Sequence, residues 1–126
     1  MGGDFGKTLN KAKGNFGENI AADYLAAKGY SIIKRNFVFG RFGEIDLVAK
    51  DGDVLVFVEV KLRTNQTYGD PLESIDFRKQ QNLRKTAEGY YYVNKISDME
   101  CRFDVVTVDI RNGMENPVIS HLVNAI

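Results

Sequence analysis

The sequence has few of the residues that hold small secreted proteins and zinc proteins together. Its 126 residues include one cysteine and one histidine, Cys101 and His121. A single cysteine excludes a disulfide within the chain, and the two residues are too few for a Cys/His zinc site. A Ser-His-Asp triad would need His121, but Ser120 beside it would point to the opposite face of a strand. We therefore interpret His121 as an ordinary surface residue.

Long apolar runs and an excess of one charge are also missing. The longest apolar run, residues 54–58, is too short to cross a bilayer, and the first ten residues lack the apolar stretch of a signal peptide. We expect a cytoplasmic protein without a membrane partner. Lys plus Arg number 17 and Asp plus Glu number 17, so the formal net charge is zero. Nucleic-acid binding would therefore have to use a local basic patch.

The length is that of one domain, and no repeat or proline-rich linker divides it. A chain of this size can bury a core without disulfides or metal. Gly2, Gly3 and Gly6 lie close together near the N-terminus. We expect residues 1–10 to form a flexible tail and residues 11–126 to form a single domain.

The hydrophobic pattern predicts two helices and five strands. Phe16, Ile20 and Tyr24 repeat at helical spacing, which predicts a helix over residues 15–28. A second helix is predicted over residues 76–93. Strands are predicted over residues 31–39, 44–50, 53–63, 102–110 and 118–122. The order α-β-β-β-α-β-β predicts an α/β fold in which helices flank a mixed β-sheet.

Two acidic residues stand out in the central hairpin. Asp51-Gly52 is a preferred pair for a two-residue turn. A turn there places Asp46 opposite Phe57 and makes it a diagonal neighbour of Glu59, roughly 7–8 Å away at the backbone. Two carboxylates at that spacing can reach one hard cation.

The same predicted face carries further charged residues. Glu44 would lie opposite Glu59, and Lys61 would lie two residues further along the face. Like charges in such positions repel, and a divalent cation would relieve the repulsion. Spacing alone leaves an alternative open, in which Lys61 and Arg63 pair with Glu44 and Glu59 on an exposed strand end.

The residues of this hairpin resemble a known nuclease pattern. Gly-Glu-Ile-Asp-Leu-Val-Ala at 43–49, followed by Phe-Val-Glu-Val-Lys-Leu-Arg at 57–63, is similar to the PD-(D/E)XK superfamily, with Ile45 where the pattern has proline. More closely, the chain resembles the bacterial YraN family, which has a restriction-endonuclease-like fold. The further matching stretches are residues 14–18, 29–30, 35–37, 68–69, 79 and 102–106.

The resemblance implies a metal-dependent endonuclease that hydrolyses phosphodiester bonds in DNA or RNA. Asp46, Glu59 and the Val60 carbonyl would hold Mg²⁺ or Mn²⁺. Lys61 would orient the attacking water or stabilise charge on the phosphate. Cutting both strands of a duplex commonly requires a dimer in this superfamily, so a homodimer is a further expectation. The alternative is an inactive nucleic-acid-binding or assembly module on the same fold, in which Glu59 and Lys61 form a structural pair.

Glu18 and Lys79 each have two interpretations. Asn15 and Glu18 have the spacing of a capping box. In resolvase-like members of the superfamily, however, a glutamate on the first helix joins the catalytic metal site, and Glu18 is the candidate for that role. Lys79, at the start of the second helix, would either reach a phosphate or extend its charged end to solvent. Asp104 is interpreted as structural.

A local set of basic and aromatic residues is the candidate surface for nucleic acid. Lysines at the helix starts would bind phosphates, with an affinity that falls as salt rises. The tyrosine of the loop after the third strand would line the site or fix the loop. The set consists of Lys11, Lys13, Arg63, Tyr68, Arg78 and Lys79.

Overall fold

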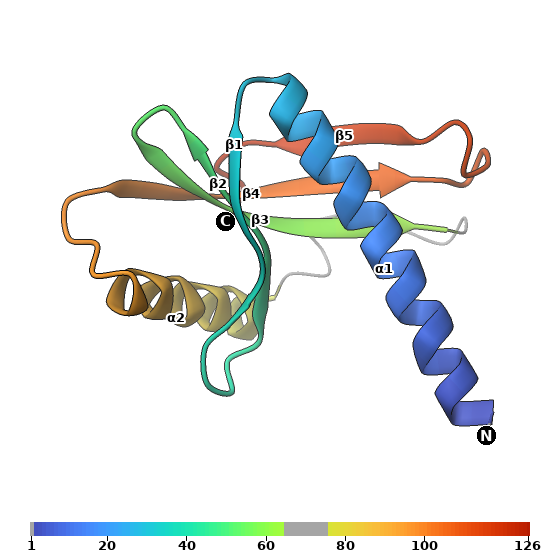
Figure 1. The fold of residues 1–126 in the computed structure, drawn as a ribbon, viewed down its shortest axis with the longest axis horizontal. Helices are drawn as coiled ribbons and strands as arrows, with labels where there is room; N and C mark the ends of the chain where they lie inside the picture. The colour runs from blue at the N-terminus through green and yellow to red at the C-terminus, as the bar shows by residue number, and fades with distance from the viewer. Residues whose placement is uncertain (1, 65–75) are drawn as a thin grey trace.

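The computed structural model describes residues 2–64 and 76–126, with side chains described from Asn15 onward. Helix α1 spans Gly2–Ala27 and helix α2 spans Phe77–Val93. The strands are β1 Ser31–Val38, β2 Glu44–Asp51, β3 Val54–Arg63, β4 Glu100–Asp109 and β5 Val118–Leu122 (Figure 1). The order α-β-β-β-α-β-β confirms the prediction.

The five strands form one mixed sheet in the order β1-β2-β3-β4-β5. Only β3 and β4 pair in parallel, and the other neighbours are antiparallel. A parallel pair needs a crossover connection, and α2 lies within the connection from β3 to β4. The central position of β3 explains why its sequence is almost continuously apolar to Val60.

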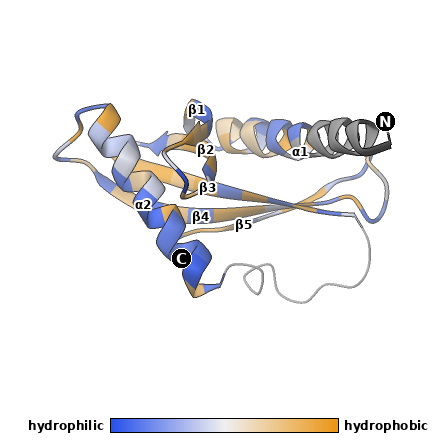
Figure 2. Cartoon of the chain, turned by 90° about the horizontal axis from the view of Figure 1, so that it is seen from below, coloured by the Kyte–Doolittle hydropathy of each residue, from blue (hydrophilic) through white to orange (hydrophobic). Residues whose placement is uncertain are grey.

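The two helices cover opposite faces of the sheet (Figure 2). Because side chains alternate along a strand, neighbouring residues enter different cores. Val48 and Phe57 pack in the core under α2. Leu47 and Val58 pack in the core under α1. α1 packs on β3 at Gly17, where an added Cβ would make an ordinary contact with Leu62 Cδ1 at 3.5 Å.

The hairpin between β2 and β3 has a different register from the predicted one. Asp51 pairs with Val54, so Gly52 and Asp53 form the turn, and Val48 lies opposite Phe57 instead of Leu55. Gly52 has a φ of 61°, and a primed hairpin turn requires such a positive value at its first central position. The predicted turn at Asp51-Gly52 was therefore wrong by one residue. The shift moves the pairing by two residues and leaves every side chain on its predicted face.

Helix α1 begins much earlier than the periodicity predicted. Its backbone is helical from Gly2, whereas the apolar repeat predicted a start near residue 15. Apolar periodicity marks only the stripe that contacts the sheet, and Ala21 and Leu25 are the residues of that stripe with no exposed area. The flexibility of residues 1–10 and the single-domain organisation stay predictions.

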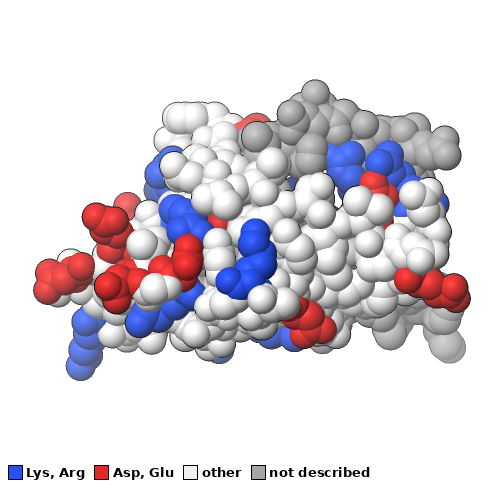
Figure 3. Space-filling model, turned by 90° about the horizontal axis from the view of Figure 1, so that it is seen from above, with Lys and Arg blue, Asp and Glu red and all other residues white. Residues whose placement is uncertain are grey.

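Charge is mixed over the surface. Figure 3 shows acidic and basic side chains interspersed with uncharged surface on one face, as the zero net charge suggests. Among the described helices, none is both long and apolar enough to cross a membrane.

Candidate metal and phosphate site

Asp46 lies where β2 separates from β3. The ladder between the two strands ends at the pair Leu47–Val58, while β2 continues to Glu44 beside β1. Beyond that pair, the Val60 backbone N–H donates to Asp46 Oδ2 at 2.8 Å. The carboxylate thus replaces a missing backbone partner, which fixes its position at the point of separation.

Asp46 is part of a compact acidic group with Glu18 of α1 and Glu44 of β2. One carboxylate oxygen from each residue lies within 4.8 Å of the other two. Glu18 is only 9% exposed, and its buried Oε1 has no hydrogen-bond partner among the described residues. A guanidinium nitrogen of Arg35 is 3.6 Å from that oxygen, within ion-pair distance. A buried carboxylate oxygen without a hydrogen bond is costly unless another group satisfies it.

The group carries more negative charge than its surroundings favour. Burial, followed by the charge of Glu59, raises the pKa of Asp46 to about 7, although the Val60 N–H acts in the opposite direction. Burial and the charges of Glu18 and Glu59 likewise raise the pKa of Glu44. Strongly raised carboxylate pKa values are common at functional sites because such sites bring like charges together.

Glu59 adjoins this acidic group but is paired with two lysines. Its Oε1 accepts a hydrogen bond from Lys79 Nζ at 2.7 Å and is 3.5 Å from Lys61 Nζ. The Glu59 side chain is 9% exposed, whereas that of Lys79 is 39% exposed. The two ammonium groups therefore meet at one buried carboxylate and remain partly open to solvent.

The two lysines have different electrostatic surroundings. Burial lowers the pKa of Lys61, and the neighbouring Lys79 lowers it further. Burial also acts to lower the pKa of Lys79, but the hydrogen bond to Glu59, the charge of Glu59 and smaller contributions from Lys61 and Asp46 together outweigh it, and the pKa is raised. Lys79 is consequently the firmer partner of Glu59, in agreement with its shorter distance.

The structure decides one of the interpretations left open by the sequence. Since α1 begins at Gly2, Asn15 and Glu18 lie inside the helix and cannot form a capping box. The capping interpretation of Glu18 was therefore wrong, and its carboxylate lies with Glu44 and Asp46 instead. Glu44 was recognised on the acidic face but was not assigned a ligand role. Its spacing of two residues from Asp46 was the available signal.

The predicted nucleic-acid residues are only partly described. Arg78 is exposed and follows the helix cap Asp76, whose side chain accepts from the Lys79 backbone N–H at 2.8 Å. Lys79 is turned to Glu59, a contact that the sequence did not indicate. Arg63 ends β3 and is partly buried. The side chains of Lys11 and Lys13, and the whole of Tyr68, lie outside the described residues.

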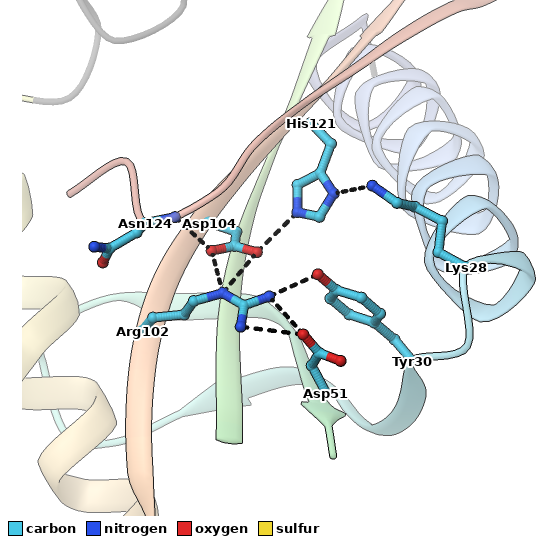
Figure 4. A network of polar contacts seen from close by, with 7 residues as sticks. All are labelled: Lys28, Tyr30, Asp51, Arg102, Asp104, His121 and Asn124. Carbon is cyan, nitrogen blue, oxygen red and sulfur yellow. Dashed lines mark hydrogen bonds and ion pairs between the residues drawn. The ribbon is translucent and has the colours of Figure 1, made fainter. Parts of the chain in front are cut away.

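A second polar network lies under the C-terminal end of α1, with Asp104 at its centre (Figure 4). Asp104 is fully buried and accepts from Arg102 Nε at 3.1 Å and from the Asn124 backbone N–H at 2.9 Å. His121 Nε2 is 2.8 Å from Asp104, and Lys28 Nζ is 2.9 Å from His121 Nδ1. An ammonium group can only donate, so Lys28 donates to Nδ1, and Nε2–H donates to Asp104.

This network corrects the interpretation of His121 as a surface residue. Its side chain is 2% exposed, and the rings of Tyr24 and Tyr30 pack edge-on against it. The side chain packs against Tyr24 of α1 and is hydrogen-bonded by Lys28, contacts between distant parts of the chain that the sequence did not indicate. The contacts of Asp104 join β4 to β5 and to the C-terminal residues, which fits the structural role predicted for it.

Comparison with known proteins places the chain in a family. The model of "Uncharacterised protein family UPF0102" matches residues 17–108. A UPF0102 protein of Acetivibrio thermocellus is 42% identical over 102 residues, covering 81% of this chain and 78% of the relative. One of Clostridium tetani is 46% identical over 105 residues, covering 83% and 85%. One of Clostridium botulinum strain 657 is 45% identical over 117 residues, covering 92% and 94%. The resemblance to the YraN family is thereby confirmed, and the chain belongs to the UPF0102 (YraN) family.

Proposed function

We propose that this protein is a metal-dependent phosphodiesterase that hydrolyses nucleic acid. The observation that carries the proposal is the acidic group Glu18, Glu44 and Asp46, with a buried Glu18 oxygen that lacks a hydrogen bond. Beside it, Lys61 and Lys79 meet at Glu59. Carboxylates for a cation and ammonium groups for a phosphate thus lie next to each other, as phosphoryl chemistry requires.

The acidic group has the chemistry of a site for Mg²⁺ or Mn²⁺. Hard divalent cations prefer oxygen ligands, and these three side chains offer only carboxylate oxygens. A cation would offset the burial and the neighbouring negative charge that raise the pKa of Asp46, and it would bind the Glu18 oxygen that has no hydrogen-bond partner among the described residues. When bound, such an ion polarises a phosphoryl oxygen and lowers the pKa of a coordinated water.

The ligand set supported by the structure differs in part from the one that the resemblance implies. Asp46 and Glu18 remain in it, and Glu44 joins them. Glu59 already holds two ammonium groups, so it would enter the metal sphere only by giving up part of that pairing. The Val60 carbonyl stays a candidate, because Asp46 already lies against the backbone N–H of the same residue.

The lysines would act on the phosphate. Glu59 fixes both ammonium groups, so their positive charge is in place before a substrate arrives. Lys61 would stabilise charge that develops on the phosphate, and the partly exposed Lys79 would hold a neighbouring oxygen. Preorganised charge of this kind needs no rearrangement during the reaction.

One observation favours the second candidate function, an inactive nucleic-acid-binding or assembly module. That alternative expects Glu59 and Lys61 to form a structural pair, and they lie within ion-pair distance. An inactive module does not explain, however, why three further carboxylates lie beside the Glu59–Lys61 pair. Metal binding at the acidic group separates the two candidates, because an inactive module does not need it.

The direct experiment is a cleavage screen with Lys61→Ala as the test variant. Single-stranded and duplex DNA and RNA are incubated with the protein in Mg²⁺ and in Mn²⁺. We expect cleavage by the parent and a rate lower by about 10²–10³ for the variant, with nucleic-acid binding nearly unchanged. Lys50→Ala, which removes a partly buried lysine at the other end of β2, should cleave like the parent.

Thermal unfolding of the same variants excludes a purely structural cause. If Lys61 were only the partner of Glu59, its removal would lower stability, and added Mg²⁺ would partly restore it. A Lys61→Ala protein with unchanged stability and unchanged cleavage would show that Lys61 has neither role.

A further inference from the structure

A hollow of about 300 Å³ adjoins the proposed site. One wall is the turn between β1 and β2, at residues 42–44, and the other is the first two turns of α2. Glu44 belongs both to this hollow and to the acidic group, and Lys79 belongs both to the hollow and to the Glu59 pair. A group bound in the hollow would therefore lie immediately beside a phosphate held at the site.

The lining combines one aromatic ring with two cations, two carboxylates and an amide. Phe42 is 37% exposed, and Lys85 of α2 lies 5.0 Å from the centre of its ring, which holds the ring against the helix. Leu83 adds apolar surface, and Arg78 adds a second cation beside Lys79. The side-chain amide of Asn82 also lines the hollow and has both a donor and an acceptor for the edge of a base.

A second exposed aromatic ring lies at the same end of α2. Phe77 is 73% exposed and lies in the chain between the lining residues Asp76 and Arg78. Exposed aromatic rings next to basic residues are typical of surfaces that bind single-stranded nucleic acid, because each base can stack on a ring while cations hold the backbone. Packing among the residues that the structure describes gives no reason for so exposed a ring at this place.

We propose that the hollow between residues 42–44 and the start of α2 receives one unpaired base next to the scissile phosphate. The inference rests on the proposed function, because the phosphate is placed by the metal and lysine site. A base in an intact duplex is stacked and paired and cannot enter a hollow of this size without being extruded. The substrate is therefore single-stranded nucleic acid, or the single-stranded part of a larger structure.

The test measures binding separately from cleavage. Fluorescence anisotropy follows a labelled single strand and a blunt duplex of the same sequence, in EDTA and in Ca²⁺, with the parent and three variants. Phe42→Ala removes the ring, Phe42→Tyr keeps a stacking ring, and Tyr92→Ala removes an 80% exposed ring that does not line the hollow. Circular dichroism confirms that each variant is folded.

We expect the parent to bind the single strand more tightly than the duplex. Phe42→Ala should weaken single-strand binding by roughly five- to a hundredfold, the range for loss of one stacked base. Phe42→Tyr and Tyr92→Ala should bind like the parent. Equal binding of the two forms by the parent, binding of neither, or equal losses for Phe42→Ala and Tyr92→Ala would overturn the inference.

The outcomes also distinguish this inference from the proposed function. Ring-dependent binding of single strands without any metal-dependent cleavage would remove the catalytic proposal and leave the base-binding hollow. Cleavage that depends on Lys61 but occurs equally on blunt duplexes, with no effect of Phe42→Ala, would remove the hollow and leave the catalytic proposal.

Discussion

At the scale of single residues, the position of Asp46 lowers the stability of the folded protein. Its carboxylate accepts from the Val60 N–H, yet it is buried next to Glu18 and Glu44. A protein that only had to fold would gain stability by replacing such a residue. Unfavourable electrostatic environments of this kind are common at ligand-binding sites, where function and stability make opposite demands on a residue.

The raised pKa of Asp46 makes a prediction about pH. The pKa is about 7 in the folded protein and about 4 in an unfolded chain, so between these values the folded state binds more protons. Stability must then fall as pH rises through this window. Each pKa unit corresponds to roughly 1.4 kcal/mol, which makes the effect a few kcal/mol.

The variant Asp46→Asn tests the predicted fall in stability as pH rises. The amide oxygen can still accept from the Val60 N–H, but the charge is gone. In EDTA, the variant should be more stable than the parent at about pH 8, and the difference should shrink toward about pH 4. Urea unfolding of both proteins across that pH range measures the difference in their free energies of unfolding. A difference that stays constant with pH would contradict the assignment of the raised pKa to Asp46.

The positions of the site residues were predictable from sequence only where the alternation of side chains along a strand determined them. The positions of Asp46, Glu59 and Lys61 follow from strand alternation, and the register shift of two residues did not alter their faces. The position of Glu18 depended on how α1 crosses the sheet, and the pairing of Lys79 with Glu59 joins residues 20 positions apart. Local patterns carry no information on such contacts.

At the scale of elements, the packing of α2 against the β1–β2 hairpin depends on a missing side chain. Gly89 is buried within α2, and a Cβ built there would collide with the ring of Phe39. Glycine inside a helix costs about 1 kcal/mol relative to alanine. Here the close approach of helix and ring outweighs that cost.

Gly89→Ala should therefore destabilise the protein by roughly 1–3 kcal/mol, although the same change in an open helix is stabilising. Denaturant unfolding measures the free energy. In a Phe39→Ala background the collision is absent, so adding Gly89→Ala should be neutral or stabilising. If the single variant is as stable as the parent, the described approach of α2 to Phe39 is wrong.

Element order was more predictable than element ends. Apolar periodicity and turn residues located all seven helices and strands that the structure describes, and β5 was predicted at its observed bounds. The start of α1 was missed because Gly2, Gly3 and Gly6 favoured a flexible tail, although Phe5 and Leu9 continue the helical spacing of apolar residues. The turn was misplaced because Asp51, Gly52 and Asp53 offer two overlapping turn pairs, and local propensity does not choose between them.

At the scale of the whole molecule, the two helices cover separate cores on the two faces of the sheet, while the proposed metal and phosphate site takes residues from both helices. Glu18 comes from α1, and Lys79 comes from α2. Because the net charge is zero, the proposed binding of nucleic acid would depend on the local arrangement of these residues. A homodimer remains a prediction, since it follows from the resemblance alone.

The central claim is that the acidic group holds a divalent cation, and Mn²⁺ binding tests it most directly. Isothermal titration with Mn²⁺ compares the parent with Glu44→Gln, Asp46→Asn and a control, Asp53→Asn, which changes an exposed carboxylate in the β2–β3 turn. We predict that the parent and the control bind one ion alike and that the other two variants lose most of the affinity. Binding of Mn²⁺ by Asp46→Asn and Glu44→Gln as tightly as by the parent would contradict the account.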